Sequence, residues 1–195
     1  MKKNPNLNRK KAPDTSRRNR LWAAIRWYLL LFFAASFLGY VWEVFLFLWK
    51  EGAFYNRGFF RGPWLPVYGL GAVLFYLCLH WLKDRPCYVF LLSLMLGSGV
   101  ELSTGILLDV VWGLRYWDYR TSFANLNGYI CLSSALAFGL AGVLWVCLFT
   151  RQLALFWQSL SAHFQSLILS LLLTVFIVDT AAALVFPNTG YGVTF

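Results

Sequence analysis

Five long apolar stretches limit what this chain can fold into more than any other feature of its sequence. A helix needs about 20 mostly apolar residues to cross the hydrocarbon core of a bilayer. Charged residues make up 13% of the 195 residues, whereas they make up roughly a quarter of a soluble domain. The sequence therefore predicts an all-α fold, a polytopic transmembrane helical bundle of about five spans. The expected spans are approximately residues 27–49, 64–82, 87–111, 129–149 and 166–186.

The distribution of basic residues predicts the orientation of this bundle. Eight of the 17 lysines and arginines precede Leu21, and basic residues beside a span favour the cytoplasmic side of the membrane. We therefore expect residues 1–20 to form a disordered polybasic cytoplasmic arm and residues 21–195 to form the transmembrane domain. The N-terminus would lie inside and the C-terminus outside. Such an arm suits anionic lipid headgroups, and we expect no nucleic-acid partner.

Segment 150–165 differs from the spans because its apolar residues recur at helical spacing among polar residues. This pattern predicts a short interfacial helix on the cytoplasmic side of the membrane. Two interpretations of this helix remain open. It either docks a cytoplasmic partner or connects two spans while it lies in the headgroup region.

Four carboxylates lie inside the apolar stretches, at Glu43, Glu101, Asp109 and Asp179. An ionised carboxylate near the bilayer centre costs about 2.5–3.5 kcal/mol, so such groups persist when they are paired, protonated or in a polar cavity. With a rise of about 1.5 Å per residue, all four fall at the middle of the membrane or in its outer half. We therefore expect an outward-facing polar cavity in which Glu43 and Glu101 are functional. The alternative is helix packing with a few buried hydrogen bonds, which we favour for the neighbouring glycines.

Two longer connections supply counter-charges for these acids. Arg57 and Arg61 precede the expected second span, where they either bind an anionic group beside its helix start or neutralise a nearby acid. Asp118 lies between aromatic residues and near two arginines, which indicates a salt-bridged lid. The expected substrate-binding or ion-pair cluster comprises Glu43, Asn56, Arg57, Arg61, Glu101, Asp118 and Asn127.

Two blocks of the sequence resemble a known family. The first runs from Gly39 and Glu43 into the loop and helix start that follow, and the second joins Glu101 to segment 117–128. The residues of these blocks that we assign to structural roles are Gly58, Gly62, Pro63, Pro66, Tyr68, Gly69, Gly71, Gly105, Trp117, Tyr119 and Gly128. Over about residues 36–149 the chain is similar to the bacterial family of putative type IV ABC-transporter permeases. The resemblance implies a multi-pass protein of the bacterial cytoplasmic (inner) membrane.

The function that we expect is that of a permease-like subunit of a transporter, with the substrate unassigned. The chain has no Walker-type phosphate loop, so an ATPase would be a separate subunit. Five spans are few for a complete pathway, so a homo-oligomer is also expected. The alternatives are a membrane enzyme, or a binding or scaffold protein, that acts on lipid-linked or envelope substrates. The sequence shows no nucleophile, metal-ligand or nucleotide motif, so we expect no catalytic residue, metal or cofactor.

Overall fold

The computed structural model describes residues 15–189, and within this range the chain forms helices and no strand. Pro66 and Pro86 each stand in the first turn of a helix, where the missing N–H costs nothing. The elements are α1 (Thr15–Glu51), α2 (Pro66–Leu79), the 3-10 turn η1 (His80–Leu82), α3 (Pro86–Trp112), α4 (Leu132–Val143), the π-helical η2 (Leu144–Phe149), α5 (Thr150–Ser159) and α6 (Ala162–Val185).

Within the described residues, four helical stretches are long and apolar enough to cross a membrane: α1, α3, α6 and the continuous helix Leu132–Ser159. The all-α polytopic bundle is therefore confirmed. The expected second span, 64–82, is a shorter apolar helix over Pro66–Leu82. The count is thus four long helices and one short one, where the sequence predicts about five spans.

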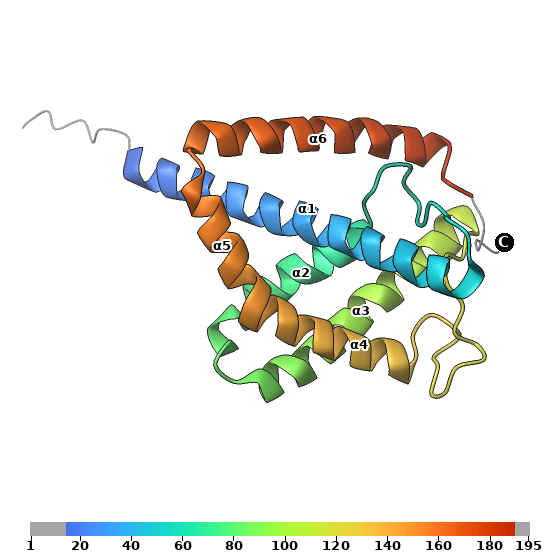
Figure 1. Ribbon diagram of the computed structural model, residues 1–195. Coiled ribbons are helices and arrows are strands. Elements are labelled where there is room, and N and C mark those ends of the chain that lie inside the picture. The colour runs from blue at the N-terminus through green and yellow to red at the C-terminus, as the bar shows by residue number, and fades with distance from the viewer. Residues whose placement is uncertain (1–14, 190–195) are drawn as a thin grey trace, which may run out of the picture.

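Two expected boundaries fall elsewhere in the structure. Residues 1–14 of the expected arm lie outside the described residues, and α1 begins at Thr15, within the range assigned to the arm. In segment 150–165, α5 continues the helix that begins with α4, and a new helix starts at Ala162. Ser161 caps this start, because its hydroxyl accepts a hydrogen bond from the backbone N–H of Phe164. Figure 1 shows α5 running across one end of the bundle toward the start of α6.

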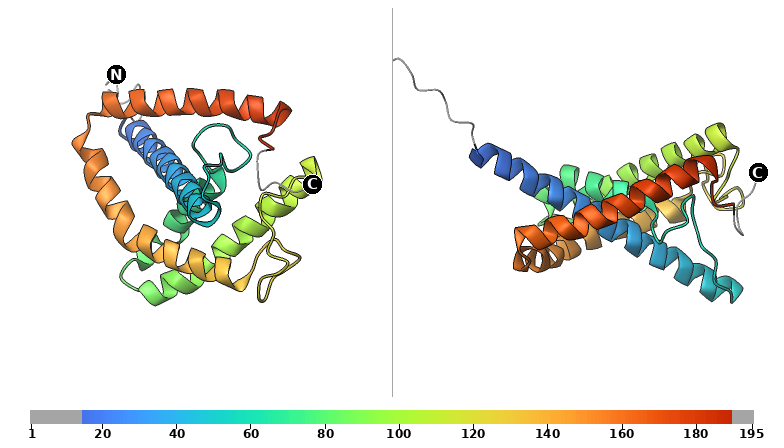
Figure 2. Two further views of the ribbon diagram at one scale, coloured as in Figure 1. Left: turned by 45° about the vertical axis from the view of Figure 1, so that its right-hand side comes forward. Right: turned by 90° about the horizontal axis from the view of Figure 1, so that it is seen from above.

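The connections gather at two opposite ends of the molecule. Figures 1 and 2 show the loops 52–65 and 113–131 at the same end as the last turns of α1 and α6. The α2–α3 turn and the α5–α6 turn lie at the other end, beside the start of α1. The chain therefore alternates between the two ends, which is the arrangement that consecutive membrane crossings require.

Small residues bring the helices of two hairpins into close contact. Ser36 of α1 is fully buried against Gly69 of α2, where an added Cβ would lie 2.2 Å from the Ser36 hydroxyl oxygen. Ser93 of α3 is likewise buried against Gly142 of α4, where an added Cβ would lie 2.0 Å from the Ser93 hydroxyl oxygen. Such contacts are the usual means by which membrane helices pack, because lipid provides no hydrophobic drive for their association.

The helix α2 begins beside the middle of α1 and not beside the C-terminal end of α1. The backbone N–H of Leu65 donates to the carbonyl of Ser36 at 3.0 Å. Ser36 precedes Trp49 by 13 residues, which corresponds to about 20 Å along the helix axis. The loop 52–65 therefore folds back along α1 before α2 starts, and this explains why the second apolar helix is short.

The Ser36–Gly69 contact predicts a large difference between two glycines of one helix. We expect Gly69→Ala to destabilise the protein by about 1–3 kcal/mol, because the new methyl group would meet the backbone carbonyl of Phe32 at 2.6 Å. The matched control is Gly71→Ala, whose methyl group would meet nothing within 4 Å and should stabilise the helix by up to about 1 kcal/mol. Thermal unfolding in detergent measures both. Equal melting temperatures for the two variants would contradict this packing.

The grouping of the loops predicts the outcome of cysteine labelling. In a variant with the four native cysteines replaced by alanine, Thr121→Cys should react with a membrane-impermeant maleimide on intact cells. Lys83→Cys should react only after the cells are permeabilised, because the two exposed sites lie at opposite ends of the bundle. Labelling of Lys83→Cys from outside would overturn the expected orientation.

Candidate functional site

Polar side chains from both hairpins meet inside the bundle near the end that carries the two long loops. Four of them come from helices α1 to α4 and two come from the loops 52–65 and 113–131. We call this group the polar cluster. Its members are Glu43 (α1), Arg57 (first loop), Tyr68 (α2), Glu101 (α3), Tyr119 (second loop) and Ser134 (α4).

Glu43 is held by one residue of α2 and one of the first loop. The Tyr68 hydroxyl donates to Glu43 Oε1 at 2.7 Å, and Arg57 Nε lies 4.0 Å from Glu43 Oε2. Tyr68 reaches this carboxylate because α2 crosses α1 at Gly39, where an added Cβ would lie 2.3 Å from the tyrosine ring. Because Gly39 has no side chain, the ring of Tyr68 can pack against α1 one turn before Glu43 and donate to its carboxylate.

Arg57 is a buried cation with contacts on several sides. Only 7% of its surface is exposed, its Nη2 donates to the carbonyl of Tyr116 at 2.7 Å, and its guanidinium lies 3.9 Å from the ring centroid of Phe47. Burial lowers the pKa of Arg57, while the negative charge of Glu43 raises it. Arginine keeps its proton even under such burial, so the loop carries a fixed positive charge to Glu43.

Glu101 is buried to 7% exposure and is contacted by hydroxyl groups. The Tyr119 hydroxyl donates to Glu101 Oε1 at 3.0 Å, and the Ser134 hydroxyl oxygen lies 2.9 Å from Glu101 Oε2. Burial raises the pKa of Tyr119, and its hydrogen bond to Glu101 and the negative charge of Glu43 raise it further. Tyr119 therefore keeps its proton and acts as a donor. Among residues 15–189, no lysine or arginine forms an ion pair with Glu101.

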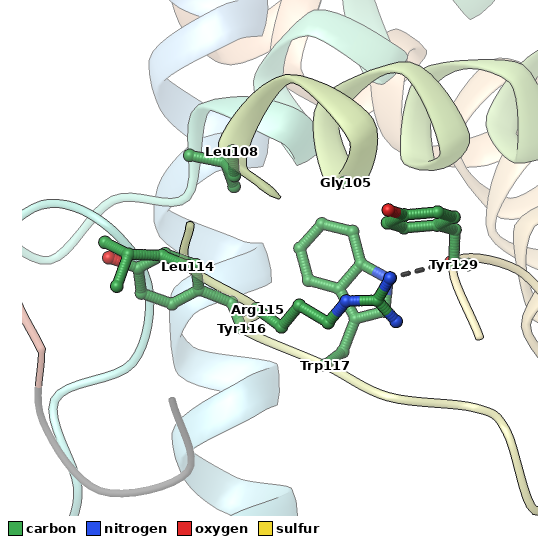
Figure 3. A pocket seen from close by; sticks show the side chains of 7 residues that line it. All are labelled: Gly105, Leu108, Leu114, Arg115, Tyr116, Trp117 and Tyr129. Carbon is green, nitrogen blue, oxygen red and sulfur yellow. Dashed lines mark hydrogen bonds between the residues drawn. The ribbon is translucent and has the colours of Figure 1, made fainter. Parts of the chain in front are cut away.

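The second loop is held in place by an arginine beside the end of α3. Figure 3 shows Arg115 and Trp117 around a small pocket under Gly105. Arg115 donates to Asp109 Oδ2 from Nε at 3.0 Å and lies 4.4 Å from the ring centroid of Tyr129. The Trp117 indole donates to the carbonyl of Tyr129 at 2.8 Å. These contacts fix the loop and thereby hold Tyr119 over Glu101.

Asp179 on α6 binds the first loop instead of joining the polar cluster. Its carboxylate accepts from the backbone N–H groups of Arg61 at 3.2 Å and Gly62 at 2.9 Å, and from the indole of Trp64 at 2.7 Å. Just beyond α6, the side chain of Asn188 donates to two carbonyls of the same loop, each at 3.0 Å. The end of α6 is therefore tied to the loop that carries Arg57.

The structure brings together three of the residues that the sequence analysis grouped, Glu43, Arg57 and Glu101. The other members of that group lie outside the polar cluster. Asp118 is exposed and pairs with Arg120 in its own loop at 2.5 Å, and the side chain of Arg61 is exposed. The side chain of Asn56 donates to the carbonyl of Arg61 at 2.8 Å, and the carbonyl of Asn127 accepts from Arg115 at 3.2 Å.

Three members of the polar cluster were not among the expected binding residues. Tyr68 and Tyr119 stood among the residues given structural roles, and Ser134 carried no assignment. A tyrosine at the start of a span and a tyrosine next to Asp118 are visible in the sequence, yet interfacial tyrosines are common in membrane proteins. Ser134 becomes recognisable only when α4 packs against α3.

The three hydrogen bonds to Asp179 predict a strong effect of an isosteric change. Asp179→Asn replaces one acceptor oxygen by an amide that faces N–H donors, so we expect a loss of about 1–3 kcal/mol of stability. Asp118→Asn is the matched control, because its exposed pair with Arg120 lies within one loop and should contribute little. Detergent-solubilised thermal unfolding tests both variants, and an unchanged melting temperature for Asp179→Asn would show that this anchor is dispensable.

Comparison with known proteins gives one match. A family model described as "Putative ABC-transporter type IV" matches residues 30–184. The matched range contains all six residues of the polar cluster. No curated protein and no solved structure shows a match to this chain.

Proposed function

Because the chain belongs to the family described as "Putative ABC-transporter type IV", we propose that it is a permease-like subunit of a transporter and that the polar cluster is its substrate-binding site. The chain is a membrane protein related to ABC transporters, and four helices in residues 15–189 are suited to crossing a bilayer. The bacterial cytoplasmic membrane is its proposed location, with the N-terminus inside. The observation that carries the proposal is a set of ionisable side chains gathered from several helices. Within membrane helices, such residues commonly mark substrate or ion pathways.

The arrangement of the loops supports a route to the polar cluster from one end of the bundle. Arg57 and Tyr119 are contributed by loops, whereas Glu43 and Glu101 are contributed by long helices. In the structure Arg57 contacts Glu43 and Tyr119 contacts Glu101, so a substrate would reach these carboxyl groups when the loops move. Both loops lie at the end that the charge distribution places outside, so the proposed site opens outward.

The opposite end of the bundle is the proposed docking surface for a separate ATPase subunit. The helix α5 crosses this end, and its exposed face carries Arg151, Gln152 and Gln158. An energy-supplying partner on the cytoplasmic side would contact this helix first. A homo-oligomer would supply the additional helices that a complete pathway needs.

Complementation of a deletion strain tests the proposed site. We expect Glu43→Gln, Arg57→Lys and Glu101→Gln each to reduce complementation at least tenfold while the protein level in membranes stays normal. The two glutamine variants remove an ionisable carboxyl group, and Arg57→Lys removes the guanidinium group that contacts Glu43 and the carbonyl of Tyr116. Asp118→Asn is the control and should complement fully, because Asp118 lies outside the cluster.

Two results would count against this function. Normal complementation by all three variants would show that the polar cluster takes no part in transport. Disappearance of the protein in all three would assign the cluster to assembly of the bundle, as expected for a scaffold.

A further inference from the structure

The hydroxyl of Ser134 has one proton and three polar neighbours. Its oxygen lies 2.9 Å from Glu101 Oε2, 3.0 Å from the carbonyl oxygen of Cys131 and 3.2 Å from the backbone nitrogen of Cys131. The N–H of Cys131 must donate to the hydroxyl oxygen. The carbonyl of Cys131 can only accept. The role of Glu101 therefore determines whether the group is satisfied.

An ionised Glu101 leaves this group with one proton too few. Both Glu101 Oε2 and the carbonyl of Cys131 would then be acceptors, and the single proton of Ser134 can serve only one of them. The carbonyl of Cys131 keeps the N–H of Ala135 as a donor at 3.0 Å in either case. The remaining contact would nevertheless hold two lone-pair oxygens about 3 Å apart with no proton between them, which is electrostatically repulsive in a buried site.

A protonated Glu101 satisfies every contact in the group. The Glu101 Oε2–H donates to the Ser134 oxygen, the Ser134 O–H donates to the carbonyl of Cys131, and the Cys131 N–H donates to the Ser134 oxygen. The hydroxyl then makes one donated and two accepted bonds, its full complement. Glu101 Oε1 remains free to accept from Tyr119 at 3.0 Å.

The charges around Glu101 favour the same protonation state. The titratable groups that act on it are Glu43 from α1, Tyr68 from α2 and Tyr119 from the second loop, and the thiol of Cys131 before α4 acts on Tyr119. Arg57 is the cation of the cluster, and it contacts Glu43 and the carbonyl of Tyr116. An ionised Glu101 would thus be a buried negative charge close to the carboxylate of Glu43 and without a cation paired to it, which is costly away from water.

We propose that Glu101 is a proton-binding site, loaded with a proton in this conformation, and that the transport cycle exchanges this proton with water when the loop 113–131 moves Tyr119 away. On exchange, the O–H bond of the carboxylic acid breaks, its electron pair stays on Oε2 and the proton passes to water. Hydration of the opened site then stabilises the carboxylate. The exchange step rests on the proposed transport function, whereas the loaded proton does not.

Infrared spectroscopy in lipid membranes tests the loaded proton directly. At pH 7 we expect a carbonyl stretch from a protonated carboxylic acid, which Glu101→Gln abolishes and Ser134→Ala shifts. Asp118→Asn is the control and should leave the band, because Asp118 lies outside the polar cluster and pairs with Arg120. A wild-type spectrum without this band, or a band that persists in Glu101→Gln, would overturn the proposal.

Stability and complementation test the remaining claims separately. Glutamine resembles a neutral carboxylic acid, so Glu101→Gln should keep a melting temperature close to that of the wild type at pH 7 while it fails to complement. A large drop in melting temperature would argue for an ionised Glu101. If the wild-type protein shows the infrared band and Glu101→Gln still complements fully, the loaded proton stands but the exchange step is overturned. If Glu43→Gln and Arg57→Lys also complement normally, the proposed transport function itself fails, and this result differs from a failure of the exchange step alone.

Discussion

The absence of water inside a bilayer is the constraint on which the rest of this structure depends. A carboxylate within the helices is costly unless it finds a partner in the protein, because lipid offers none. Glu43 finds Tyr68 and Arg57, Glu101 finds Tyr119 and Ser134, and Asp179 finds the backbone of the first loop. The carboxylates of the helices thus anchor the two long loops, and the anchored loops place Arg57 and Tyr119 beside Glu43 and Glu101.

Two helical hairpins of this chain provide partners for a buried or partly buried glutamate in the same way. In α1 and in α3, a fully buried serine and a glycine precede a glutamate on the same helix. The returning helix contributes a hydroxyl group to each glutamate, and the long loop between the helices contributes a second polar contact. The cationic contact goes to Glu43 and the phenolic contact to Glu101, so the two sites differ in charge although they share a plan.

The last helix belongs to neither hairpin and is held both along its length and at its end. Phe176 packs against Phe33 and Trp64 midway along α6, while Asp179 and Asn188 anchor the first loop near its C-terminus. Tyr116 of the second loop also donates to the carbonyl of Asn188 at 2.7 Å. The end of α6 therefore links both loops, and a movement of either loop would be felt there.

Composition and local pattern were enough to determine the class of this protein. Apolar stretches about as long as a bilayer is thick predict the helices, and Pro66, to which the sequence assigned a structural role, stands in the first turn of α2. The identity of Glu43 and Glu101 as residues of interest also followed from the sequence, because a carboxylate in an apolar stretch is costly wherever its helix packs. These conclusions depend on each residue and its near neighbours in the chain.

Only the tertiary structure decided which polar residues meet. Asp118 and Tyr119 are adjacent in sequence, yet Asp118 pairs with Arg120 at the surface and Tyr119 points to Glu101. The short length of α2 likewise follows from a loop that folds back to Ser36. The physical reason is that pairing depends on how each helix is rotated and how deep each loop descends. The rotation of a helix and the depth of a loop are determined by contacts between residues far apart in the chain, and a local sequence pattern cannot predict these contacts.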